Sequence, residues 1–286
     1  MTIPTIATIG TPAVLLVLCL FRGLKESRGS TLHAPIVWAL FATAGLALDA
    51  VVESLSAGSE QGIGLSSLRF AAAAGTFCPL MAVLGAKRPQ NRGWQWVVLT
   101  LWIVVVWPAA QAVLIPTGLR LELSVVWKLF LVGLVWVGLL NYLPTRNWLA
   151  AFFVAGGQLV LLDSYLWRWS LVDRRWVPAI GLGCFLVAAT LVWVRQHRKR
   201  KKDDPLAWRR FTEFDQHWLD FRDAYGALWA LRILARVNQA AEVQDWPMRL
   251  GWSGFTLLRM EDISIPSAEQ LGKLQTTMAT LLRRFV

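Results

Sequence analysis

Seven stretches of this chain are each apolar enough and long enough to cross the roughly 30 Å hydrocarbon core of a bilayer as a helix. They are bounded by polar, proline or charged breaks and cover residues 3–21, 34–54, 67–86, 94–115, 121–141, 148–166 and 177–194. Inside lipid, only helices and closed barrels satisfy their own backbone hydrogen bonds, so we expect a transmembrane helix bundle. The first stretch has no preceding Lys or Arg and no small-residue cleavage pattern after it, and we interpret it as a retained span.

A dense run of basic residues directly follows the last stretch and orients the bundle. The run comprises Arg195, Arg198, Lys199, Arg200, Lys201 and Lys202. Lys and Arg concentrate in cytoplasmic loops, so the run predicts a cytoplasmic C-terminus and, with seven spans, an external N-terminus. The loops after the first, third and fifth spans are also basic, whereas loop 55–66 holds no Lys or Arg. Segment 165–176 disagrees, because it would lie outside despite Arg168, Arg174 and Arg175, and a wrong pairing of the last two spans is the alternative. At the cytoplasmic surface the run would also bind anionic lipid headgroups, at about 1 kcal/mol per basic residue.

Composition divides the chain into a membrane bundle and a tail. We expect an all-α protein with a polytopic transmembrane helix bundle over 1–194, a polybasic juxtamembrane linker over 195–202 and a small cytoplasmic helical domain over 203–286. The formal net charge is +11, but residues 203–286 hold 10 Lys or Arg against 11 Asp or Glu. The excess positive charge therefore lies at the membrane borders, which favours lipid headgroups over nucleic acid as a partner.

Apolar residues in the tail recur at three- and four-residue steps, a pattern typical of amphipathic helices. The first pattern continues to about Val243, as one helix or as two in series with a break near Gly226. Pro, Gly and Trp interrupt it over 245–255, and Ser267 with Gln270 forms a capping-box pair that begins a last helix. These helices could form a small core or lie on the membrane surface.

Aromatic residues on the first tail helix are candidate anchors for a protein partner, because rigid rings supply much of the binding energy at such interfaces. The candidates are Trp208, Phe211, Trp218, Phe221 and Tyr225.

Ionisable residues inside the predicted spans form a second candidate site. The topology places five of them in the outer half of the bilayer, namely Asp49, Glu53, Arg69, Lys128 and Asp163. Charged groups are costly in hydrocarbon, so we expect them to face one another or water. The cluster would suit an outward-facing substrate, proton or cation site. The alternative is a set of structural ion pairs whose ends reach the interface.

Other residue patterns disfavour several kinds of chemistry. The three cysteines, Cys19, Cys78 and Cys184, fall inside apolar stretches without CxxC spacing, which argues against disulfides and zinc. The histidines lie outside the span cores, so no imidazole pair is available for haem or copper. No phosphate-cradling glycine loop or nucleophile elbow is present. We therefore expect no metal, no cofactor and no catalytic residue.

A family resemblance accompanies these patterns. Residues 68–90, which contain Phe77-Cys78-Pro79-Leu80, and residues 218–226 with the later 246–255 resemble an uncharacterised family of bacterial polytopic membrane proteins with a cytoplasmic tail. The resemblance implies a bacterial inner-membrane location. It implies no activity and no site residue.

Together, the patterns predict a non-catalytic accessory, assembly or scaffold protein of the inner membrane whose cytoplasmic helices bind a protein partner. The alternative is a small transporter of a solute or ion that uses Asp49, Glu53, Arg69 and Lys128.

Overall fold

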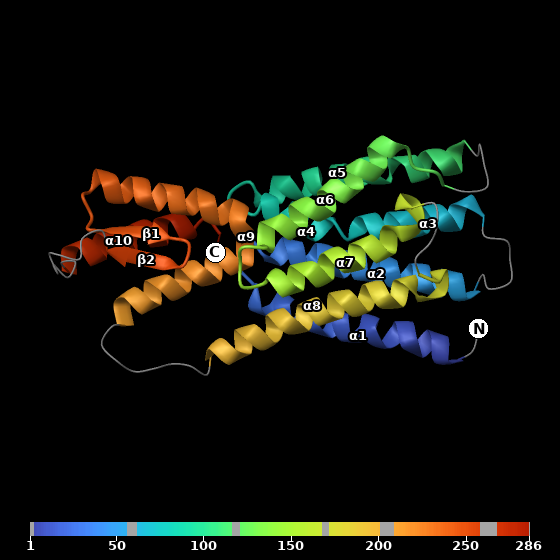
Figure 1. Ribbon diagram of the computed structural model, residues 1–286, viewed down its shortest axis with the longest axis horizontal. Helices are drawn as coiled ribbons and strands as arrows, with labels where there is room; N and C mark the ends of the chain where they lie inside the picture. Colours follow the sequence, from blue (N-terminus) through green and yellow to red (C-terminus); the bar gives the residue numbers. More distant parts are fainter. Residues whose placement is uncertain are drawn as a thin grey trace.

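The computed structural model describes residues 3–55, 62–115, 121–167, 172–200, 209–257 and 268–285, and most of them are helical. The bundle helices are α1 (Ile3–Glu26), α2 (His33–Leu55), α3 (Ile63–Gly75), α4 (Cys78–Leu84), α5 (Asn91–Leu114), α6 (Val125–Tyr142), α7 (Trp148–Leu166) and α8 (Val177–Arg200), with a 3-10 turn at Arg174–Trp176 before α8. They lie side by side along the long axis of the molecule, and the tail lies at one end of them (Figure 1).

Among the described residues, six helical segments are long and apolar enough to cross a membrane: α2, α3 together with α4, and each of α5 to α8. The interior of the bundle holds apolar residues such as Phe70 and Leu162. Its outer surface is apolar too, with Leu18, Trp107 and Trp136 exposed. Helices that are apolar all round are typical of bundles in lipid. The predicted all-α fold is confirmed, and the count of seven spans stays a prediction, with α1 packed against α2 and α8.

The third predicted span consists of two helices rather than one. α3 ends at Gly75, Thr76 and Phe77 form a tight turn on the carbonyls of Ala73 and Ala74, and α4 begins at Cys78. Pro79 lies in the first turn of α4, where its missing N–H removes no helical hydrogen bond. The break therefore costs little free energy. Beyond it, α4 reaches the end of the bundle where α9 packs.

The tail consists of a bent helix, a β-hairpin and a last helix. α9 (Arg209–Val243) runs towards the bundle, turns sharply at Gly226 and runs away again (Figure 1). The hairpin pairs β1 (Met248–Gly251) with β2 (Gly254–Leu257), and α10 (Ala268–Leu282) follows. The break near Gly226 and the end of the helix at Val243 agree with the sequence prediction, whereas the hairpin was not predicted. The capping-box residue Ser267 lies outside the described residues.

The tail has its own core. Trp218, Met248 and Leu274, from α9, β1 and α10, are each fully buried there. Ala86, from the loop between α4 and α5, belongs to the same apolar cluster. The tail is therefore a packed unit that includes a piece of the bundle's end.

Candidate functional sites

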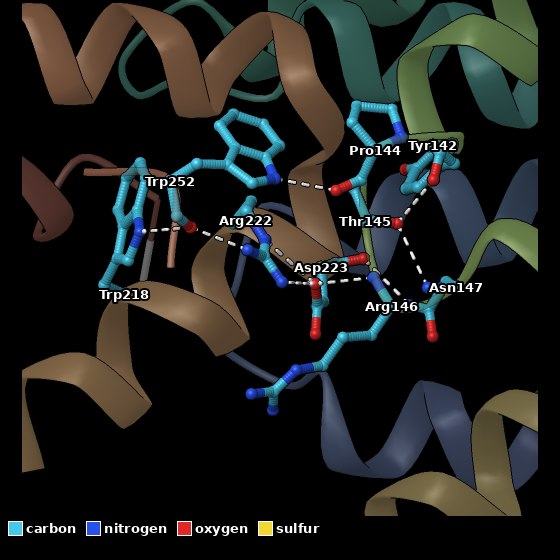
Figure 2. A network of polar contacts seen from close by, with 9 residues as sticks. All are labelled: Tyr142, Pro144, Thr145, Arg146, Asn147, Trp218, Arg222, Asp223 and Trp252. Carbon is cyan, nitrogen blue, oxygen red and sulfur yellow. Dashed lines mark hydrogen bonds and ion pairs between the residues drawn. The ribbon is translucent and has the colours of Figure 1, made fainter. Parts of the chain in front are cut away.

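A network of polar contacts joins the tail to the loop between α6 and α7 (Figure 2). Asp223 Oδ1 accepts hydrogen bonds from the backbone N–H of Arg146 at 3.1 Å and from Arg222 Nη2 at 2.9 Å. The Asn147 side-chain amide donates to the Asp223 carbonyl oxygen at 2.9 Å. Arg222 and Asp223 are both buried, so each offsets the desolvation of the other's charge.

Trp252, from the turn of the hairpin, extends this network. Its indole N–H donates to the Pro144 carbonyl at 2.7 Å, and its own carbonyl accepts from Arg222 Nη1 at 2.7 Å (Figure 2). The Arg222 guanidinium also lies over the Trp252 ring, 5.2 Å from its centroid. Trp218 Nε1 donates to the same carbonyl at 3.3 Å. The hairpin is thus bonded both to α9 and to the bundle.

The bend of α9 makes a second contact with the end of α6. Asn141 Oδ1 accepts the backbone N–H of Leu228 at 3.0 Å, and the Tyr142 hydroxyl donates to the Ala224 carbonyl at 3.1 Å. Gly226, between them, has a φ of 79°. An added Cβ there would collide with the Asn141 side chain, so only glycine permits this approach.

The Tyr225 hydroxyl forms a third contact, with the C-terminal residues and the loop between α1 and α2. It lies 3.0 Å from both the Phe285 carbonyl and Thr31 Oγ1. Thr31 Oγ1 also lies 3.1 Å from the Ala86 carbonyl. Burial raises the pKa of Tyr225, because water no longer solvates the phenolate, and the hydrogen bonds with Ser30 and Thr31 oppose that rise.

The C-terminal residues and α9 are also bonded to the bundle through backbone atoms. The N–H of Thr31 donates to the Phe285 carbonyl at 2.9 Å, and the N–H of Arg88 to the Arg284 carbonyl at 2.8 Å. Trp229 Nε1 donates to the Val83 carbonyl at 2.9 Å. Three loops at one end of the bundle therefore hold the tail.

These contacts involve the aromatic residues predicted to bind a partner. Trp218, Phe221 and Tyr225 are buried within the chain, and Phe221, Tyr225 and Trp229 pack around the Phe285 ring. These three rings therefore pack within the fold of the chain itself, and a role for them in binding a partner stays a prediction. Trp208 and the side chain of Phe211 lie outside the described residues.

At the far end of the bundle from the tail, the structure brings together three of the five predicted ionisable residues. Arg69 lies between two carboxylates of α2, with Nε 3.2 Å from Asp49 Oδ2 and Nη2 2.6 Å from Glu53 Oε2. Asp49 and Glu53 are one helical turn apart and share a face. Arg69 and Asp49 are buried, while the Glu53 side chain is 16% exposed. We call this group the ion triad.

The ion triad is incompletely paired. Among the described residues, Asp49 Oδ1 and Arg69 Nη1 have no hydrogen-bond partner although both atoms are buried. Lys128, half-buried on α6, forms no ion pair with the triad in the described part of the chain. Asp163 is buried near the end of α7. Two carboxylates thus share one arginine in an apolar setting.

The predicted lipid-binding run continues α8 as helix to Arg200, and Lys201 and Lys202 lie outside the described residues. The boundary predicted at residue 194 therefore falls inside this helix. Among the described residues, no three His, Cys, Asp or Glu side chains come together in a way that could hold a metal ion.

The residues that dock the tail were not predicted from the sequence, among them Thr31, Asn141, Asp223 and Trp252. Two of them carried a signal. Asn141 is a polar residue at the apolar end of α6, three positions before Pro144, and Asp223 follows Arg222 on an otherwise amphipathic helix. Both patterns are common in sequences, so they indicate no contact until the fold shows which segments are neighbours.

The fold and these sites define a class. The described part of the chain is a helical bundle with six segments long and apolar enough to cross a membrane, and a tail docks on one end of it. No protein-family model, no curated protein and no solved structure matches the chain. The resemblance to bacterial polytopic membrane proteins remains a prediction.

Proposed function

We propose that this chain is a multi-pass protein of the bacterial inner membrane and acts as a non-catalytic accessory or scaffold component, whose docked cytoplasmic tail binds a protein partner. The observation that carries the proposal is the docking itself. A tail held by buried hydrogen bonds to three loops presents its outer surface in one orientation, and a preorganised surface loses less entropy when it binds.

The charge distribution supports a cytoplasmic tail. Basic residues gather at the bundle end that carries the tail, both in the loops and at the helix ends: Arg22, Lys25, Arg28, Lys87, Arg88, Arg92 and Arg146. This is the bias that marks cytoplasmic loops. The basic run that begins at Arg195 forms the last turns of α8 at the same end, where it would bind anionic headgroups.

The proposal is tested by purifying the protein in nanodiscs directly from its native membrane and quantifying bound proteins by mass spectrometry. We expect a near-stoichiometric partner with the wild type. Deleting 203–286 removes that partner while the bundle remains folded. The double variant Asn141→Ala with Asp223→Ala, which loosens the docking, weakens binding. The exposed Gln239→Ala serves as the control and leaves binding unchanged.

Two results would overturn the proposal. One is a set of bound proteins that stays the same after the tail is deleted. The other is a wild-type protein that carries only lipid.

The ion triad supports a second candidate function, transport of a small solute or ion. The buried Asp49 shares Arg69 with the partly exposed Glu53, and its Oδ1 has no hydrogen-bond partner among the described residues, so this oxygen could receive a proton or cation. Asp49→Asn would then abolish uptake or its pH dependence without loss of folded protein. Glu122→Gln, which changes an exposed carboxylate, is the control. Uptake that is unaffected by Asp49→Asn would exclude this function for the triad.

A further inference from the structure

Two adjoining cavities lie where the tail meets the bundle, and arginine dominates their polar lining. The first, of about 590 Å³, lies between residues 29–31 and residues 88–92. The second, of about 510 Å³, adds Thr280, Arg283 and Arg284 from the end of the tail. Arg88 and Pro89 line both. We call the two together the junction cavity.

Among the described residues, the lining of the junction cavity is positively charged and holds no acidic side chain. Four arginines line it, Arg88, Arg92, Arg283 and Arg284, and no Asp or Glu does. In the described part of the chain, none of the four forms an ion pair. Guanidinium groups gathered in this way repel one another, and a bound anion would relieve the repulsion.

Backbone groups hold Arg88 in place. Arg88 donates one side-chain hydrogen bond, to the Gly29 carbonyl, and its N–H bonds the Arg284 carbonyl. A guanidinium has five N–H donors, so most of those on Arg88 stay available. Arg92 lies in the first turn of α5, which contains no acidic residue and no side-chain cap. A cation is unfavourable at this end of a helix, and an anion is favourable.

The position of the cavity relative to the candidate membrane spans indicates which anion it binds. Two candidate membrane spans begin at His33 and Asn91, directly after the loop residues that line it. Just beyond, on α5, Trp96 and Val97 are exposed and apolar. A ligand held here would have its charged end among the arginines and an apolar part against α5. Phosphate is the group that arginine binds most specifically, by paired hydrogen bonds.

We propose that the junction cavity binds a phosphate-bearing ligand at headgroup depth, with an anionic phospholipid as its natural source. The site is distinct from the basic run that begins at Arg195 in the last turns of α8. Because it lies between the bundle loops and the tail, an occupied site would also strengthen the docking of the tail. The proposal rests on the membrane location given under the proposed function, but not on a protein partner for the tail.

The test compares the full-length wild type with two double variants, each of which removes two positive charges. Arg92→Gln with Arg283→Gln changes the cavity, and both side chains are exposed and without a hydrogen bond in the described part of the chain. Arg22→Gln with Lys25→Gln changes exposed residues at the end of α1, close to the same membrane boundary but outside the cavity. Circular dichroism verifies that each variant is folded.

Cardiolipin is the lipid probe, offered in phosphatidylcholine nanodiscs and followed by native mass spectrometry. We expect the cavity variant to bind it roughly thirtyfold more weakly than the wild type, and the control variant to stay near wild type. In lipid-free detergent, pyrophosphate is the soluble probe. Pyrophosphate could raise the melting temperature of the wild type but not of the cavity variant, while cardiolipin binds both proteins equally. That result would support the phosphate site and would identify its ligand as a soluble phosphate.

Two outcomes would overturn the proposal. Equal loss in both variants would mean general attraction to an anionic surface. No loss of either probe in the cavity variant would mean that the arginines hold no ligand.

Discussion

Arg69 is the residue on which the ion triad depends, because it faces two carboxylates inside the bundle. Replacing it with Met would leave Asp49 buried without a counter-ion, and breaking such a pair typically costs about 3–5 kcal/mol. We expect Arg69→Met to lower the free energy of unfolding by about that amount, measured by chemical unfolding in mild detergent.

Lys128→Met is the matched control, since Lys128 is half-buried and forms no ion pair with the triad among the described residues. We expect it to change stability by less than about 1 kcal/mol. Stability retained by Arg69→Met would contradict the prediction and would show that the fold does not depend on this ion pair.

The triad also shows how far residue types alone predict a site. Asp49 and Glu53 are predictable as a pair, since four-residue spacing places them on one helix face. Arg69 joins them because α3 packs directly against α2. Lys128 stays apart because its helix, α6, packs against α7 and α9. Depth in the membrane can be counted from the sequence, but the neighbours and rotation of a helix depend on side-chain packing along its whole length.

At the scale of elements, the bend of α9 depends on one glycine. Gly226 combines a φ of 79° with the close approach of Asn141, so Gly226→Ala meets both backbone strain and a steric collision. We expect it to destabilise the docked tail by more than about 1 kcal/mol, measured as faster proteolysis of α9.

Gly272→Ala is the control for the glycine change itself. Gly272 is exposed within α10, and an added Cβ there would meet nothing within 4 Å. Alanine is a better helix former than glycine, so this variant should be neutral or slightly more stable. Equal proteolysis of the two variants would show that the bend tolerates a side chain.

The helices of the tail could be predicted from apolar periodicity, but the hairpin could not. Its strands are four residues long, and an isolated hairpin of this size is marginal in water. Contacts with α9 stabilise it. Asn238 makes two hydrogen bonds to the backbone of Leu250, at 2.8 and 2.9 Å, and Asp215 accepts the N–H of Phe255 at 2.7 Å. These partners are distant in the sequence, so local patterns show only a break.

At the scale of the whole molecule, the tail and the bundle bury surface that each would expose alone. The amphipathic pattern of α9 correctly indicates an apolar face, but a pattern does not say what covers it. Here α10, the C-terminal Phe285 and the bundle loops do so. Trp218 and Tyr225 therefore stabilise the assembly of the chain itself. Any partner must bind the surface that remains.

The Tyr225 contact makes this docking sensitive to alkaline pH. Burial raises the pKa of Tyr225 above its ordinary 10.0, so the docked state favours the neutral hydroxyl. The Tyr225 hydroxyl therefore contributes fully to the stability of the docked tail below pH 10, and this contribution is lost as pH rises through the raised pKa. Tyr225→Phe cannot ionise. This variant should lose about 1 kcal/mol of docking free energy at neutral pH. Its docking should show no further loss at alkaline pH from this position.

The measurement combines a tyrosinate absorbance titration with proteolysis of the tail over the same pH range. Subtracting the Tyr225→Phe titration from that of the wild type removes most of the signal of Tyr142 and Tyr165, the other two tyrosines of the chain. We expect the midpoint of the difference to lie above 10, and cleavage of the wild-type tail to accelerate over that interval. A midpoint at 10 would instead mean that the hydroxyl reaches water, which would contradict a tail closed onto the bundle.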